Sequence, residues 1–143
     1  MTYGIRYSLA ALAISASAAS AYAAETMTYK ADLKGASEVP VNATKGTGEV
    51  TATYDPASKM LSWKGSYSGL TGPVTAAHFH GPAEAGKNAG VLVPAPVTTS
   101  PFTGSAQLDA AKAADLDAGK LYFNVHTAAN PAGEIRGQVV KAK

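Results

Sequence analysis

Apolar and polar side chains alternate in short runs along the chain, and glycine or proline separates the runs. In "GEVTATYD", Val50, Ala52 and Tyr54 alternate with polar residues. An alternation of period two predicts half-buried β-strands, and turn residues between the runs predict antiparallel connections. The pattern therefore predicts an all-β protein, an antiparallel sandwich or barrel. Its expected strands lie over 48–55, 59–70, 74–80, 121–127 and 134–140.

Two segments depart from this alternation. The alanine-rich stretch "LDAAKAADLDAGK" predicts one short helix, with Asp109 as its N-cap and Gly119 at its C-terminal stop. The proline-rich stretch "NAGVLVPAPVTTSPFTGS" predicts an edge strand followed by a loop, because proline cannot donate to a central sheet ladder.

The first 23 residues have the layout of a secretory signal peptide. Arg6 precedes a short apolar run, and Ala21-Tyr22-Ala23 forms a cleavage site of small residues. We expect cleavage after Ala23, which leaves residues 24–143 as a single domain. The segment also predicts a periplasmic or secreted location without a membrane anchor.

Composition then narrows the function classes. The formal net charge is +2, and no block of basic residues occurs, so the pattern of a nucleic-acid binder is absent. The chain has no cysteine, which excludes disulfides, thiolate metal sites, a cysteine nucleophile and a lipoprotein anchor. The oligomeric state is left open.

Histidine is rare in the chain, yet two of the three histidines stand one residue apart in "AAHFHGPAEAG". Alternate residues of a strand share a face, so His78 and His80 point the same way and Phe79 points into the core. In "LYFNVHT", the apolar set is Leu121, Phe123 and Val125, and His126 therefore lies on the non-core face. If the two strands are neighbours, the three imidazoles converge beneath the loop "GPAEAGKNAG" and suit zinc, copper, iron or nickel.

Arg136, in "EIRGQVV", is expected on the outward face of its strand together with Glu134 and Gln138. Beside a metal it would supply a fixed positive charge that attracts a small anion. Simpler interpretations exist for each feature: a solvated H-x-H pair, a hydrogen-bonded His126, and a surface ion pair of Arg136 with Glu134.

The stretches "LKGASEVPVNATKGTGEVTATYD", "LTGPVTAAHFHGPAEAGKNAGVLV" and "LYFNVHTAANPAGEIRGQV" resemble, in this order, the motifs of the CHRD domain family. The resemblance runs from about Leu33 to Val139. It implies a Greek-key or immunoglobulin-like β-structure and an exported protein, and it says less about chemistry.

The site layout is similar to that of the copper-zinc superoxide dismutases, which place an H-x-H pair on one strand, a later copper histidine and an arginine near the copper. His78, His80, His126 and Arg136 follow that chain order. The chain lacks the cysteine pair, the metal-bridging histidine and the zinc loop of those enzymes, so the resemblance implies a copper-only site. Glu38 or a water is left open as a further ligand.

Three hypotheses follow from these residues. The first is a copper-only superoxide dismutase with His78, His80 and His126 as metal ligands and Arg136 as the catalytic, anion-guiding residue. The second is a non-enzymatic copper carrier or buffer with the same ligands. The third is an extracellular interaction module whose histidines are structural.

Overall fold

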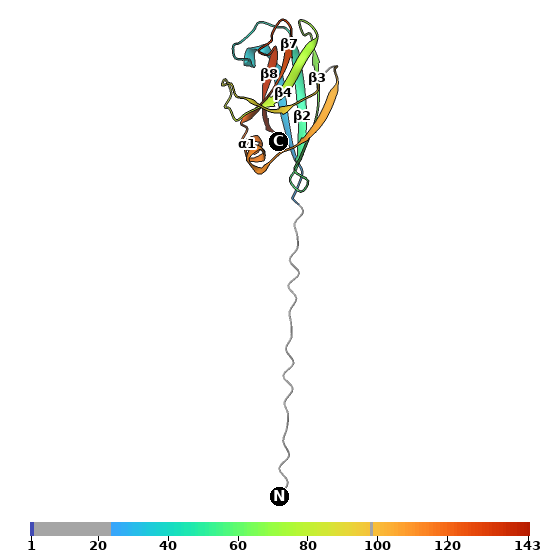
Figure 1. Cartoon of the computed structure of the whole chain (residues 1–143), viewed down its shortest axis with the longest axis vertical. Helices are drawn as coiled ribbons and strands as arrows, with labels where there is room; N and C mark the ends of the chain where they lie inside the picture. Colours follow the sequence, from blue (N-terminus) through green and yellow to red (C-terminus); the bar gives the residue numbers. More distant parts are fainter. Residues whose placement is uncertain (2–23, 98) are drawn as a thin grey trace.

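The computed structural model of the chain describes Met1 and residues 24–143, except residue 98. The predicted signal peptide lies outside the described residues. Eight strands form one sheet in which every neighbouring pair is antiparallel, in the order β5-β4-β7-β8-β1-β2-β3-β6. Figure 1 shows the strands running along the length of the domain. No described helix is long and apolar enough to cross a membrane. The elements are β1 (Met27–Lys34), the 3-10 turn η1 (Gly35–Ser37), β2 (Thr47–Asp55), β3 (Met60–Ser68), β4 (Val74–His80), β5 (Val91–Pro94), β6 (Phe102–Gln107), α1 (Ala110–Asp117), β7 (Leu121–Thr127) and β8 (Ile135–Lys141).

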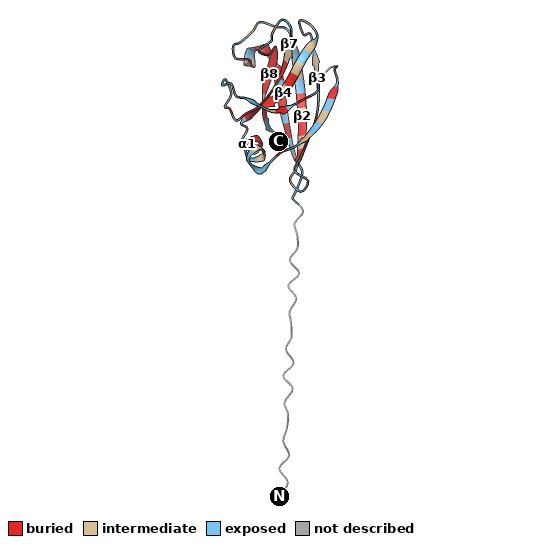
Figure 2. Ribbon diagram, in the orientation of Figure 1, coloured by how far each residue is buried: buried red, intermediate tan, exposed pale blue. Residues whose placement is uncertain are grey.

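The sheet curls so that strands distant in its order face each other across one core. Trp63 on β3 contacts Phe79 on β4 at 5.1 Å between ring centroids, although four strands separate β3 from β4 in the sheet order. Phe102 on the edge strand β6 stacks on Phe123 of β7 at 5.8 Å. The buried positions recur along the strands in Figure 2, as expected where one face of each strand is covered. The predicted all-β sandwich or barrel with one short helix is confirmed.

The pattern missed two strands. β1 carries the buried alternation of Tyr29, Ala31 and Leu33, and it lies in the middle of the sheet between β8 and β2. β6 comprises mostly small or polar residues and follows Pro101, so it lacks a strong strand signal. The proline-rich stretch therefore contains the predicted edge strand, β5, and also the start of β6 at the opposite edge.

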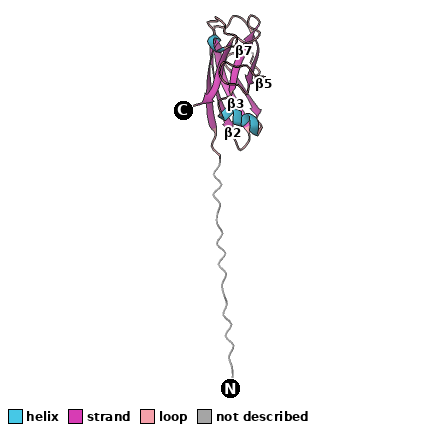
Figure 3. Ribbon diagram, turned by 90° about the vertical axis from the view of Figure 1, so that its left-hand side faces the viewer, coloured by secondary structure: helices cyan, strands magenta, loops and turns pink. Residues whose placement is uncertain are grey.

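The helix lies where the sequence placed it. The Asp109 carboxylate accepts a hydrogen bond from the Lys112 backbone N–H at 2.9 Å, and Gly119 follows the C-cap with a φ of 70°. Leu116 is the residue of α1 that packs into the core. Figure 3 shows α1 at one end of the domain, where it closes that end of the core.

Glu134 differs from its prediction as an outward-facing partner of Arg136. Its side chain is fully buried and accepts hydrogen bonds from the Thr44 hydroxyl at 2.6 Å, the Thr127 hydroxyl at 2.6 Å, and the Thr71 hydroxyl and backbone N–H at 2.8 Å each. Among the described residues no ion pair joins it to Arg136. Burial opposes ionisation of this carboxyl, yet the hydrogen bonds outweigh it and lower the pKa to about 2. Glu134 therefore ties the loops around residues 44 and 71 to the start of β8.

Replacement of Glu134 by glutamine is expected to lower the free energy of unfolding by about 1–3 kcal/mol at pH 7, because an amide nitrogen would face hydroxyl donors. The folded-state pKa lies below the unfolded one, so the carboxylate stabilises the fold above about pH 4.5 and loses this effect as pH falls towards 2. Urea unfolding of both proteins between pH 7 and pH 3 should show the difference shrinking. Glu49→Gln, at an exposed position of β2, is the control. An equal loss at both pH values would contradict the role of the charge.

Candidate metal centre

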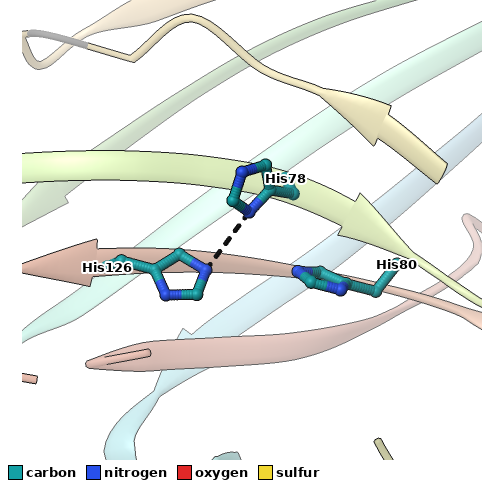
Figure 4. Close-up of side chains that lie close together, drawn as sticks. All are labelled: His78, His80 and His126. Carbon is teal, nitrogen blue, oxygen red and sulfur yellow. Dashed lines mark hydrogen bonds between the residues drawn. The ribbon is translucent and has the colours of Figure 1, made fainter. Parts of the chain in front are cut away.

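The pairing of β4 with β7 brings the three histidines together. Ala76 lies opposite His126, His78 opposite Asn124, and His80 opposite Tyr122. The histidines share the outward face, because Ala77, Phe79 and Val125 occupy the core face of the same strands. Figure 4 shows the three rings converging from the two strands. The convergence predicted from alternation is thus present.

The ring nitrogens lie at distances that suit a shared ion. His78 Nδ1 and His126 Nε2 are 3.2 Å apart, and one nitrogen of each histidine lies within 4.8 Å of the others. Two imidazole nitrogens, each about 2.0–2.1 Å from one metal, lie roughly 2.9–3.6 Å apart. The His78–His126 pair already has this spacing, and a nitrogen of His80 lies within 4.8 Å of both. Among the described residues, this is the group of histidines and carboxylates that could hold a metal ion.

Two backbone carbonyls orient the rings. His80 Nδ1 lies 3.0 Å from the Ala89 carbonyl oxygen, and His126 Nδ1 lies 2.9 Å from that of Pro131. A carbonyl only accepts, so in the tautomer that forms these two bonds each Nδ1 carries the proton and each Nε2 keeps a lone pair. Metal-ligating histidines characteristically donate their second N–H in this way. The residues present therefore fit a three-histidine metal site.

The environment keeps two of the rings neutral. Burial, followed by the proximity of His126 and His80, lowers the pKa of His78. Burial also lowers the pKa of His80, and this outweighs the opposing effect of its contacts with Ala89 and Asn124. A neutral imidazole is the form that binds metal, so the pair is ready to bind a cation at neutral pH.

The centre is closed on one side and open on the other. His80 is 8% exposed, because its ring stacks on Tyr122 at 4.8 Å and the loop of residues 81–90 covers it. We call this segment the cover loop, and it occupies the place predicted for a cover. His78 and His126 are half-buried. A groove of about 290 Å³, lined in part by His78, Ala76 and Val97, opens beside His78.

Arg136 is placed differently from its prediction as a free outward cation. It is 2% exposed, and its guanidinium carbon lies 3.4 Å from the centroid of the Tyr122 ring. It donates to the Lys87 carbonyl and, at 2.9 Å, to the Asn88 side-chain oxygen, both in the cover loop. Because β7 lies between β4 and β8, Tyr122 lies between Arg136 and His80. Arg136 thus holds the cover loop, and the Tyr122 ring separates its charge from His80.

Two further residues border the centre, and of these the sequence pointed only to Glu38, which was left open as a metal ligand. The Asn124 side-chain oxygen lies 2.9 Å from His80 Nε2. Glu38 lies beside the Asn124 amide nitrogen. Burial raises the Glu38 pKa to about 7, although Arg136 and Asn124 partly counteract it. Asn124 lies on the same face as His126, and this position could have suggested that Asn124 borders the site. Glu38 is distant in sequence, and no sequence pattern links it to Asn124.

Comparisons with known proteins agree with the sequence motifs. The family described as the CHRD domain matches this chain over residues 29–139. That range includes all three histidines, Arg136, Asn124 and Glu38. No curated protein and no solved structure gives a match to the chain.

Proposed function

Because this chain belongs to the CHRD domain family and its three histidines converge beside an open groove, we propose that it is an exported copper-binding protein and that its site dismutates superoxide. The observation that carries the proposal is the orientation of the rings. The carbonyls of Ala89 and Pro131 face Nδ1 of His80 and of His126, and in the tautomers that donate to them both Nε2 lone pairs are available to one cation. A buried structural histidine does not need such convergence. Export rests on the signal-peptide layout of residues 1–23.

Copper is proposed because the reaction requires a metal that changes its oxidation state by one electron, which zinc cannot do. Copper would supply that one-electron chemistry. His78, His80 and His126 would hold it through three neutral nitrogens. The cover loop would exclude bulky reductants on the His80 side, while the groove beside His78 would be the route for a small anion.

Arg136 would act through its field. Its guanidinium is fixed by two contacts with the cover loop and by the Tyr122 ring, so its charge keeps one position and needs no rearrangement when an anion approaches. A fixed positive charge near a narrow site raises the local concentration of a small anion and its encounter rate. Since Arg136 contacts no histidine, we assign it guidance and loop positioning and no direct contact with the metal.

The same position of Arg136 favours a second candidate, a copper carrier or buffer. A guanidinium that is already engaged by the cover loop serves to shape the metal site whether or not a substrate arrives. Redox turnover of the copper-loaded protein separates the enzyme from the carrier. Failure of the native protein to bind copper would leave an interaction module with structural histidines.

Replacement of Arg136 by methionine is expected to lower the superoxide dismutation rate about tenfold, because methionine keeps much of the apolar contact with Tyr122 and removes the charge. Arg136→Lys should lose less, since the charge remains and only the planar donor fork is lost. The measurement is superoxide decay after pulse radiolysis, on samples with matched copper content and matched circular dichroism.

The rate of the native protein should also fall as salt concentration rises, and that of Arg136→Met should fall less steeply. A copper-loaded native protein that is no faster than free copper would defeat the enzyme proposal and leave the carrier. An active native protein with an equally active Arg136→Met variant would remove the guiding role of Arg136 alone.

A further inference from the structure

The ring of His80 lies between two oxygen atoms. Its Nδ1 is 3.0 Å from the Ala89 carbonyl oxygen, and its Nε2 is 2.9 Å from the side-chain oxygen of Asn124. A neutral imidazole has one N–H, so it can donate to only one of them. When Nδ1–H donates to Ala89, that contact uses the one ring proton. The Nε2 lone pair and the Asn124 oxygen then face each other as two acceptors, an arrangement that a shared cation stabilises.

The groups next to the Asn124 amide nitrogen explain why the side-chain oxygen, and not the nitrogen, faces His80. A Cβ atom on Gly133 would lie 2.3 Å from a Glu38 carboxylate oxygen and 2.7 Å from the Asn124 amide nitrogen, so both groups crowd over this glycine. A carboxylate only accepts hydrogen bonds when ionised, and the amide nitrogen only donates. The amide nitrogen therefore turns towards Glu38 and the oxygen towards His80. That carboxylate oxygen of Glu38 is buried and has no hydrogen-bond partner, so a donor turned towards it is favoured.

The spacing and the face both suit a ligand pair. Two donors about 2.0–2.1 Å from one metal at a right angle lie roughly 2.9 Å apart. This equals the separation of His80 Nε2 from the Asn124 oxygen. Asn124 also lies directly opposite His78 and two residues from His126, on the face that carries the histidines. It therefore stands beside the three nitrogens and not behind them.

We propose that the side-chain oxygen of Asn124 is the fourth donor of the metal centre, and that Glu38 orients it. This inference rests on the proposed metal-binding function and names a ligand beyond the three histidines. A donor set of three nitrogens and one oxygen suits tetragonal Cu(II), whereas Cu(I) is satisfied by the three imidazoles alone. Asn124 then stabilises the oxidised ion selectively and lowers the reduction potential of the site.

The experiment compares Asn124→Leu with native protein for both oxidation states. We expect the Cu(II) affinity, measured by competition with a chelator, to fall at least tenfold, and the Cu(I) affinity, measured anaerobically, to stay within about twofold. A selective tenfold loss corresponds to a rise of about 59 mV in reduction potential. The Cu(II) electron paramagnetic resonance spectrum should also change, because an oxygen donor is lost. Asn124→Asp, which keeps an oxygen at this position, should retain the native spectrum.

Gln138→Leu is the matched control. Gln138 is a second side-chain amide, on a neighbouring strand and partly buried, and it donates to the carbonyls of Ala83 and Gly119 at 2.8 Å each, away from the histidines. Its removal loosens the cover loop without removing a donor, so both copper affinities should change together or not at all. Glu38→Gln should reproduce part of the Asn124→Leu effect, since it replaces an acceptor oxygen beside the amide nitrogen with a donor group.

Three outcomes overturn the inference. Equal losses of Cu(I) and Cu(II) affinity in Asn124→Leu would mean that Asn124 only holds the His80 ring. Unchanged affinities and an unchanged spectrum would remove Asn124 from the centre. Native protein that binds neither copper nor Co²⁺ would end both the proposed function and the inference. Native protein that binds Co²⁺ but not copper would end only the proposed function, and the visible spectrum of Co²⁺ in native protein and Asn124→Leu would then decide the fourth donor.

Discussion

Replacement of His126 by alanine is expected to lower the affinity for copper at least about 100-fold. Loss of an outer partner of a metal ligand typically costs 10–100-fold, and His126, whose Nε2 lies 3.2 Å from His78 Nδ1, is a proposed ligand itself. His78→Ala and His80→Ala should have effects of similar size. Titration of each variant against a competing chelator measures the loss.

Thr103→Ala, at an exposed position of the edge strand β6, is the control and should bind copper as the native protein does. The metal-free His126→Ala protein should remain folded, because its core is unchanged. An unchanged affinity in His126→Ala would reduce the centre to the His78–His80 pair on β4. The Pro131 carbonyl, which contacts His126, would then have no role in the site. The proposed three-histidine centre would be wrong.

Replacement of Phe79 by alanine is expected to lower the free energy of unfolding by about 3–5 kcal/mol. Phe79 is 0% exposed and packs edge-on against Trp63 and Phe123, with centroid distances of 5.1 and 4.8 Å. The cavity left by its ring would lie where the two sides of the curled sheet meet. Urea unfolding of the metal-free proteins measures the cost.

Tyr67→Ala provides the comparison. Tyr67 also contacts an aromatic ring, that of Phe102 at 6.3 Å, but it is only partly buried, so its truncation should cost much less. If Phe79→Ala proved as mild as Tyr67→Ala, the assignment of Phe79 to the core face and of its neighbours His78 and His80 to the opposite face would be contradicted.

Alternation along β4 and β7 was sufficient to predict which face each side chain takes. Within a strand that face follows from the period of two, so Phe79, Phe123 and His126 could be assigned without knowing the neighbours of either strand. The helix was predictable for a similar local reason, since Asp109 and Gly119 act on backbone groups within four residues. β1 shows that the same alternation can be overlooked when lysine and aspartate occupy the exposed positions between Tyr29, Ala31 and Leu33.

The environment of Arg136 and Glu134 was not predictable in this way. Two residues apart, both would be assigned to one outward face, yet Glu134 binds threonines of three separate segments and Arg136 binds the cover loop. These partners depend on how loops fold over the outside of the sheet. Strand alternation carries no information about loops that cover the outward face, so buried charge on that face escapes it. The contact of Asn124 with Glu38 escapes it for the same reason.

The orienting acceptors of the metal centre are the carbonyls of Ala89 and Pro131. Every amino acid brings a backbone carbonyl, so substitutions at these two positions can accumulate over evolution without deleting either acceptor. Selection at these positions acts on the path of the loop and not on side-chain identity. Relatives with the same proposed centre can therefore differ at positions 89 and 131. A search by side-chain motif would find their histidines but would overlook the backbone carbonyls that orient the rings.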